Sequence, residues 1–285
     1  MNGRTVFKAL VRFLWIPLLL IVLLAVMPRP AHAAFDAQHT AFSTLLAKHV
    51  LRVNGGNASQ VQYQGFAQDR TALKVYLDSV SMVPRAEFEG WSVAQRMAFL
   101  INAYNAYTIE LVLTKYPDLQ SIKDIGSLIQ SPWKKKFFPL FGVPTSLDDI
   151  EQVMLRKRGA YDDPRLHFAL NCASIGCPML LDVAYTAERL DAQLDAQAER
   201  FMADRSRNRY NAATGQLEVS KLFEWYADDF KLGHKGIASA SAFFARYAGK
   251  LSDVPADQQK LRAQTVGVSF LDYDWRLNDA KRAAP

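Results

Sequence analysis

The stretch His167-Phe-Ala-Leu-Asn171-Cys172-Ala-Ser174-Ile-Gly176-Cys177-Pro178 holds both cysteines of the 285-residue chain. Residues 167–170 alternate as a short buried strand does, and the Gly and Pro that follow indicate a turn. A strand that ends in a cysteine-bearing turn can present a thiol at the rim of a sheet. The sequence therefore predicts a cleft at this place.

Two chemical interpretations of the stretch are open. In the first, Cys172 is a nucleophile and His167 accepts its proton, because a thiol with a pKa of ~8.5 attacks poorly unless a base or a positive dipole activates it. Residues five apart on a straight strand point to opposite faces, so the two side chains meet only if the chain turns after Asn171.

In the second interpretation, Cys172 and Cys177 form a disulfide across the turn, and the polar residues nearby recognise a ligand or fix the core. A metal site is not expected, because one His and two Cys at these spacings lack a fourth ligand and match no zinc pattern. The chain carries no nucleotide or flavin signature either, so no cofactor is expected.

Residues 1–33 resemble a signal peptide. Arg4, Lys8 and Arg12 precede an apolar run over residues 13–27, and Ala31-His-Ala33 is typical of a cleavage site. The apolar run is shorter than the ~20 residues of a bilayer span, which makes an uncleaved anchor the weaker alternative. We expect a mature chain that begins at Ala34, does not span a membrane, and is periplasmic or secreted.

The charge of the mature chain argues against a nucleic-acid partner. The whole chain has 34 Lys and Arg against 28 Asp and Glu, and the leader holds four of the basic residues, so 30 remain against 28. The local basic run Lys134-Lys-Lys136 is more typical of a solvated rim than of a ligand site. The composition thus favours an unknown small-molecule or peptide ligand over nucleic acid.

Residues 34–285 are predicted to form a single α+β domain. Removing 33 of 285 residues leaves 252, and no Gly/Ser/Pro-rich linker divides them. Helices are expected to dominate and to pack on a small mixed or antiparallel sheet. The predicted helices are 35–53, 66–80, 93–116, a helix from 146 to about 158, 186–203, 221–230 and 238–247; the predicted hairpins are 137–145 and 207–219, and the final strand is 264–273.

The helix over residues 93–116 is the most apolar segment of the mature chain. Ser92 is its predicted N-cap, and the centre is hydrophobic nearly all round, which is typical of a buried helix. Asn102 and Asn105 lie three apart, so both amides leave the same face. They either bond the backbone of neighbouring loops or line a polar cleft that faces His167 and Cys172.

Four motifs together resemble the domain-of-unknown-function 547 family: Asn102-x-Tyr-Asn105-Ala, Ser146-Leu-x-Asp-Ile-Glu151, His167-Phe-Ala-Leu-x-Cys172 and Tyr273-Asp-Trp-x-Leu-Asn278. The resemblance covers nearly the whole mature chain. Family members often have His directly after the helix Glu, whereas this chain has Gln152, so an essential base at that position would be missing. The family's pattern includes Cys172, whereas Cys177 belongs to a narrower subset.

The order of a buried polar helix, a His segment and an Asp segment also resembles papain- and transglutaminase-like cysteine hydrolases. In that comparison Asn105, His167 and Asp274 correspond to the triad, with Asn105 at the place of the nucleophile. Glu151 is either a solvated charge or, with Ser174 and Asp274, a substrate contact.

The sequence thus supports two functions. The first is a thiol-dependent hydrolase or acyl transferase that acts on an amide or acyl substrate in the cell envelope, with Cys172, His167, Asn102 and Asn105 as its catalytic residues. The second is a non-catalytic envelope module that binds a ligand or protein and contains a Cys172–Cys177 disulfide.

Overall fold

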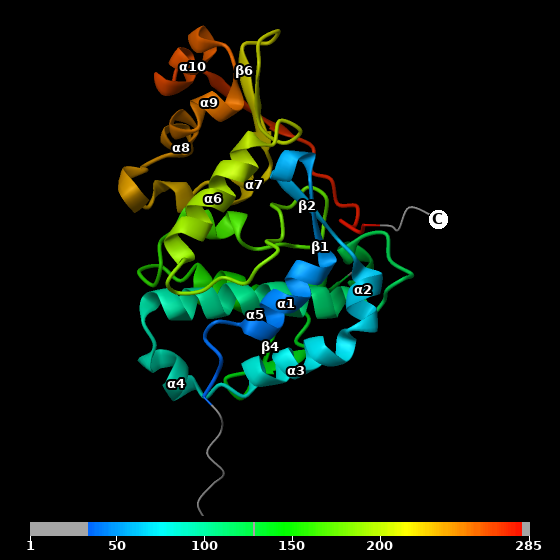
Figure 1. The fold of residues 1–285 in the computed structure, drawn as a ribbon. Coiled ribbons are helices and arrows are strands. Elements are labelled where there is room, and N and C mark those ends of the chain that lie inside the picture. The colour runs from blue at the N-terminus through cyan, green and yellow to red at the C-terminus, as the bar shows by residue number, and fades with distance from the viewer. Residues whose placement is uncertain (1–33, 128, 281–285) are drawn as a thin grey trace, which may run out of the picture. The chain divides into compact units, whose positions relative to one another are not determined.

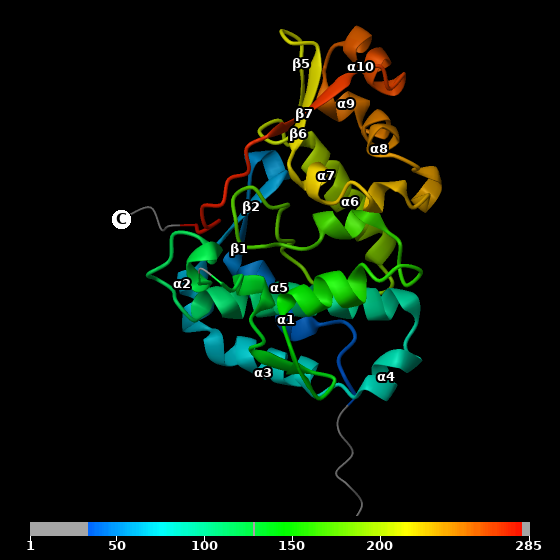
Figure 2. The same cartoon turned by 180° about the vertical axis from the view of Figure 1, so that it is seen from behind.

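The structure is a computed structural model that describes residues 34–127 and 129–280. The predicted signal peptide lies outside the described residues. From Phe35 onward these residues form one compact unit with an α+β content. Figures 1 and 2 show this unit from opposite sides.

The helices are more numerous and shorter than the sequence predicts. They are α1 Thr40–His49, α2 Tyr63–Gln68, α3 Arg70–Ser81, α4 Arg85–Gly90, α5 Val93–Leu113, α6 Leu190–Ala203, α7 Leu222–Trp225, α8 Ala240–Arg246, α9 Ala248–Leu251 and α10 Pro255–Arg262. Two further segments matter for the site: a π-helical segment, Asp149–Leu155, and a 3₁₀ helix, Pro164–Phe168.

Three small sheets accompany the helices. β1 (Val50–Val53) pairs antiparallel with β2 (Ala58–Val61), and β3 (Phe138–Leu140) pairs antiparallel with β4 (Val143–Thr145). The third sheet joins β5 (Arg209–Asn211), β6 (Gln216–Ser220) and β7 (Gly267–Leu271), with an antiparallel β5–β6 pair and a parallel β6–β7 pair. The mixed sheet and both predicted hairpins are confirmed.

Helix α5 is the centre of the larger hydrophobic cluster. Ser92 caps it through a capping box: its hydroxyl accepts from the Gln95 N–H at 3.2 Å, and the Gln95 side chain accepts from the Ser92 N–H at 3.0 Å. Helices α2 and α3 pack directly on α5. The prediction of a buried, Ser-capped helix is confirmed.

A second cluster of aromatic and aliphatic side chains fills the space between α6, α8 and the third sheet. Residues 166–170 connect the two clusters, because Leu166 and Leu170 enter the first and Phe168 enters the second. Phe168 lies 5.2 Å from Phe201 and 5.5 Å from Phe243, measured between ring centroids.

The predicted strand over residues 167–170 is therefore wrong. Pro164 begins a helical turn there, and the Asp163 carboxylate caps it by accepting from the Arg165 N–H at 3.0 Å. The alternating pattern of residues 167–170 indicated a strand, but both faces of this short helix are buried, one in each cluster. Periodicity alone does not distinguish the two cases.

Three predicted helices are shorter than expected or interrupted. The helix predicted over residues 35–53 begins only at Thr40, where the Asp36 carboxylate accepts from the Thr40 N–H at 2.8 Å. It ends where β1 begins. The helix predicted over residues 66–80 is divided at Asp69, whose carboxylate receives hydrogen bonds from Lys48 and His49. The helix predicted at 221–230 stops at Trp225, in the wall of the cavity described next.

Candidate functional site

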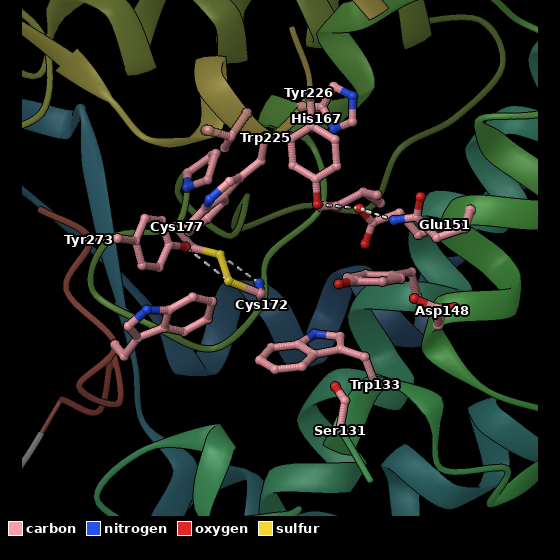
Figure 3. Close-up of a pocket in the computed structure, with 16 residues that line it drawn as sticks. Ser131, Trp133, Asp148, Glu151, His167, Cys172, Cys177, Trp225, Tyr226 and Tyr273 are labelled. Atoms are coloured by element: carbon pink, nitrogen blue, oxygen red, sulfur yellow. Dashed lines mark hydrogen bonds between the residues drawn. A yellow bond between two sulfur atoms is a disulfide. The ribbon is translucent and has the colours of Figure 1, made fainter. Parts of the chain in front are cut away.

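A cavity of about 220 Å³ lies between α5, the π-helical segment, α7 and the residue 172–178 turn. Figure 3 shows its side chains, which come from segments far apart in the sequence. Six of them are aromatic: Tyr104, Trp133, Trp225, Tyr226, Tyr273 and Trp275. This is a concave, mostly apolar site with a few polar groups, as small-molecule sites usually are.

Both cysteines line this cavity, and they are joined by a disulfide. Their Cα atoms are 6.0 Å apart, and the Cys172 N–H donates to the Cys177 sulfur at 2.8 Å. The Cys172 sulfur lies 3.1 Å from the Tyr273 hydroxyl and 3.2 Å from the Ser174 hydroxyl. In this oxidised form Cys172 carries no thiol, so the structure has the disulfide of the second interpretation.

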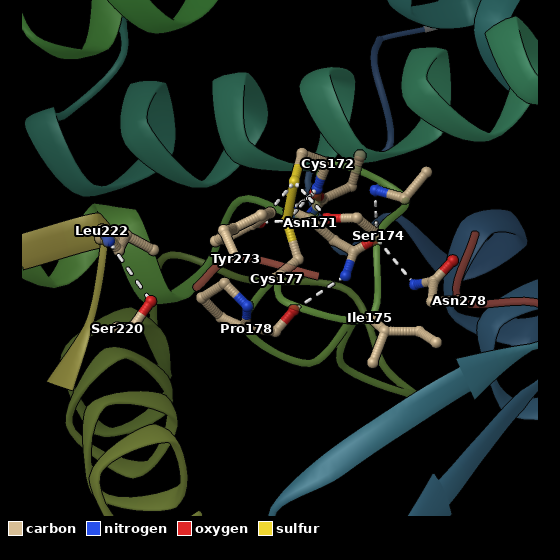
Figure 4. The surroundings of a disulfide bond; sticks show 12 residues. Asn171, Cys172, Ser174, Ile175, Cys177, Pro178, Ser220, Leu222, Tyr273 and Asn278 are labelled. Carbon is tan, nitrogen blue, oxygen red and sulfur yellow. Dashed lines mark hydrogen bonds between the residues drawn. A yellow bond between two sulfur atoms is a disulfide. The ribbon is translucent and has the colours of Figure 1, made fainter. Parts of the chain in front are cut away.

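Buried amides hold the disulfide turn in place (Figure 4). The Asn171 side chain donates to the Pro178 carbonyl at 2.8 Å and accepts from the Ala173 N–H at 3.0 Å. The Asn278 side chain donates to the side-chain amide oxygen of Asn171 at 3.3 Å and accepts from the Tyr63 hydroxyl at 2.8 Å. The disulfide therefore lies in a rigidly hydrogen-bonded wall.

Asn102 and Asn105 are fully buried and bond loop backbone. Asn102 donates to the Tyr185 carbonyl at 2.8 Å and accepts from its N–H at 2.9 Å. Asn105 does the same with the Ala169 carbonyl and the Asn171 N–H, at 2.9 and 2.8 Å. Neither amide lines the cavity. The interpretation that they bond neighbouring backbone is confirmed, and their catalytic role stays a prediction.

His167 lines the cavity, but its hydrogen-bond partner is an acid that the sequence analysis missed. Its Nε2 lies 2.7 Å from Oδ2 of Asp229, and its ring stacks on Tyr226 with centroids 3.8 Å apart. Asp229 also receives a hydrogen bond from Arg156 at 2.6 Å. Burial raises the pKa of Asp229, but the hydrogen bonds from His167 and Arg156 outweigh it, and the net pKa is lowered.

Glu151 is buried in the cavity wall with 7 % of its surface exposed, so the interpretation as a solvated charge is wrong. Its Oε1 accepts from the Tyr226 hydroxyl at 2.6 Å and from the Gln152 amide at 3.1 Å. Gln152, which replaces the family's frequent His, also accepts a hydrogen bond from Arg156. Burial and the Glu151 charge both raise the pKa of Tyr226, which keeps its hydroxyl a donor.

The other two predicted substrate contacts do not line this cavity. Ser174 is buried behind the disulfide and bonds the Tyr273 hydroxyl at 3.0 Å. Asp274 pairs with Arg276 at 2.6 Å and borders a separate cavity of about 210 Å³. Glu151, His167 and Cys172 therefore share one cavity, and the remaining predicted residues lie outside it.

One part of the cavity was not predicted from the sequence. We call it the aromatic wall and define it as Trp133, Trp225, Tyr226, Tyr273 and Trp275. Three of its rings contact one another: Tyr273 lies 4.5 Å from Trp275 and 4.9 Å from Trp225, and the two tryptophans are 5.7 Å apart. Trp133 meets Trp275 edge-on at 5.8 Å. Trp225 is 44 % exposed, an unusual exposure for so large an apolar side chain.

The charged side chains that line the cavity are acidic. Its lining includes the carboxylates of Glu151 and Asp148 and no Lys or Arg among the described residues. Lys123 is not part of that lining, but its ammonium lies 3.6 Å from the ring centroid of Trp275. The cavity thus combines π faces with negative charge.

No group of three or more His, Cys, Asp or Glu side chains suited to a metal ion occurs within residues 34–127 and 129–280. No helix in the same part of the chain has both the length and the apolar character that crossing a bilayer requires.

Residues 88–202 match the model of a family described as "Protein of unknown function, DUF547". The match contains the motifs at Asn102, Glu151 and His167 and stops before the motif at Tyr273, so it is narrower than the resemblance over nearly the whole mature chain. No curated protein and no solved structure gave a significant match. The papain- or transglutaminase-like arrangement stays a prediction.

Proposed function

We propose that this chain, which belongs to the DUF547 family over residues 88–202, is an exported module that binds a small ligand in the cavity lined by the aromatic wall. The observation that carries the proposal is the composition of that cavity. Aromatic rings, of which Trp225 is the most exposed, line it together with a buried carboxylate, and exposed apolar surface in a concave place usually marks a binding site. The leader sequence supports export to the periplasm or the medium.

The disulfide supports binding in an oxidising compartment. Cys172 and Cys177 pair in the wall of the cavity, and disulfides persist mainly outside the cytosol. Hydrogen bonds of the Asn171 side chain hold the turn, so this wall is already ordered before a ligand binds. A wall that needs no reordering lowers the entropic cost of binding.

A ligand-observed NMR screen of the mature, oxidised chain tests the proposal. The mixture contains small organic cations, neutral sugars and short peptides. We expect at least one class to bind, and Trp225→Ala to weaken that binding, while Val254→Ala, an exposed apolar residue that does not line the cavity, leaves it unchanged. Binding that is insensitive to Trp225→Ala would place the ligand elsewhere and contradict the proposal.

A second candidate is the thiol-dependent hydrolase or acyl transferase, favoured by the presence of Cys172 and His167 in one cavity. It needs a dithiol reductant, which is oxidised to its own disulfide while the Cys172–Cys177 bond is reduced to two thiols. The Cys172 thiolate would then attack an acyl carbon and expel the leaving group, and water or an acceptor would release the acyl group. The Asp229–His167 pair would supply an oriented base, as acids do for histidines in triads.

Turnover of acyl and amide substrates with and without a dithiol separates the two candidates. A hydrolase gains activity on reduction and loses it in Cys172→Ser while its fold persists, because a hydroxyl cannot replace a thiolate. A binding module shows no turnover in either state and binds its ligand in the oxidised state.

A further inference from the structure

We infer that the ligand is an organic ammonium ion of the alkyl-substituted kind, held by the aromatic wall with Glu151 as its counter-charge. The inference rests on the proposed binding function and adds the chemical class of the ligand. Three features of the cavity carry it: the state of Glu151, the arrangement of the rings, and the size of the space.

Glu151 is a buried carboxylate without an ion-pair partner among the described residues. Hydrogen bonds from Tyr226 and Gln152 satisfy one of its oxygens, and the nearby Arg156, which also attracts the Glu151 charge, is paired with Asp229. Figure 3 shows the Glu151 side chain directed into the cavity. A buried charge is costly without compensation, so a cation in the cavity gains an attraction that a neutral or anionic ligand does not.

The aromatic wall suits the same charge. A ring presents a negative face to a cation, and Trp is the strongest of the aromatic residues in this respect. The Trp275 ring already accepts an ammonium within the protein, since Lys123 Nζ lies 3.6 Å from its centroid. Trp133 and Trp225 offer further indole rings at the same cavity.

Size and hydrogen bonding favour an alkylated ammonium. At about 220 Å³ the cavity is smaller than the ~300–1,000 Å³ of most ligand pockets, so it fits a headgroup or a side-chain end. Aromatic rings outnumber the carboxylates, and Oε1 of Glu151 already accepts two hydrogen bonds. A cation with methyl groups contacts rings on several sides and needs few acceptors, as in aromatic cages for quaternary ammonium groups.

Calorimetry with choline and its uncharged isostere, in which carbon replaces the nitrogen, tests the inference. The two molecules share shape and hydroxyl group and differ in charge. We expect the isostere to bind the mature, oxidised chain about tenfold or more weakly, given the typical strength of cation–π contacts. Glu151→Gln should remove most of this preference, because the amide still accepts from Tyr226 but carries no charge. Glu199→Gln, the same change at an exposed residue of α6, should preserve it.

The outcomes separate this inference from the function on which it rests. Equal affinity for choline and the isostere, or an unchanged preference in Glu151→Gln, would overturn the ammonium ion while leaving a ligand-binding cavity. Binding of methyl glucoside that Trp225→Ala weakens, without any binding of choline, would likewise overturn the ammonium ion and leave a ligand-binding cavity. If none of these probes binds, and the broader screen is also empty, both the inference and the binding function are wrong.

Discussion

The Asn105 side chain accepts a hydrogen bond from the backbone N–H of Asn171 at 2.8 Å, while its amide group donates to the Ala169 carbonyl at 2.9 Å. One buried amide on α5 thus fixes the chain directly before Cys172. The relationship explains why a polar residue occupies the centre of an otherwise apolar helix: it satisfies two backbone groups that cannot reach water.

Asn105→Ala should therefore destabilise the fold strongly. It leaves the Ala169 carbonyl and the Asn171 N–H buried without partners, and each unsatisfied group costs about 1–3 kcal/mol. Urea unfolding should show a loss of about 2–5 kcal/mol in the free energy of unfolding. Gln60→Ala, which truncates an exposed amide on β2, is the control and should change little. A loss below ~1 kcal/mol in Asn105→Ala would show that these hydrogen bonds contribute little.

Cys172→Ser and Cys177→Ser should lower the melting temperature by similar amounts, since either change opens the same loop. Loop-closure entropy for so short a loop gives about 2 kcal/mol, or about 4–8 °C for a chain of this size. The check is scanning calorimetry, with alkylation of the denatured wild type in the absence of reductant, which should add no label. Stoichiometric labelling of the wild type, or a melting temperature unchanged in either variant, would exclude the disulfide.

His39 should make the stability fall in mild acid. It is buried beside Tyr76, whose hydroxyl lies 2.7 Å from its Nδ1, and burial lowers its pKa to about 4, although the Asp36 charge opposes this. At pH values between about 4 and ~6.5, His39 therefore carries a proton in the unfolded chain but not in the folded chain. Stability is therefore complete above the unfolded pKa and falls by about 1.4 kcal/mol per pH unit below it.

Urea unfolding at pH ~7 and pH ~5 measures this effect. The wild type should lose about 2 kcal/mol more between these pH values than His39→Gln, in which the titrating group is absent. The comparison cancels the acids and histidines that both proteins share. Identical losses in the two proteins would contradict a neutral, buried His39.

Gly176→Ala should disturb the cavity through Tyr273, although Gly176 itself does not line it. A Cβ atom at Gly176 would come within 3.0 Å of three carbons of the Tyr273 ring. Relief of that contact moves the ring, which packs on Trp225 and Trp275, at a cost of about 1–3 kcal/mol. We expect altered tryptophan fluorescence and weaker ligand binding. Gly249→Ala, where the new atom meets open space, is the matched control.

Wild-type fluorescence and binding in Gly176→Ala would mean that Tyr273 adjusts freely and does not shape the site.

The parts of the fold that were predictable depend on signals close together in the sequence. Ser92 and Gln95 form a capping box three residues apart, and the hairpin at 137–145 turns at Gly142. The short elements were less predictable, because single side chains override the periodic pattern. Asp69 interrupts one helix through contacts to Lys48 and His49, about twenty residues earlier.

The candidate site was predictable only in part for a similar reason. His167 and Cys172 are neighbours in the sequence and both line the cavity, whereas Asp229 reaches His167 across 62 residues. Trp133, Trp225 and Trp275 come from three separate segments, and no spacing rule joins them. The available signal was chemical: each tryptophan lies next to charged residues, where a large apolar ring is more typical of a binding surface than of a core.

Fluorine NMR of the oxidised, mature chain labelled with fluorotryptophan probes the proposed ligand site at each indole ring separately. Of the four tryptophans in residues 34–285, Trp133, Trp225 and Trp275 line the cavity, while Trp91 packs against Phe35, Phe88 and Phe99. The chain is titrated with choline, and with methyl glucoside as a neutral probe. We expect choline to shift the three cavity resonances together and to leave the Trp91 resonance unmoved. Resonances that stay unchanged with both probes, or a shift at Trp91 equal to the others, would contradict a ligand site in the aromatic wall.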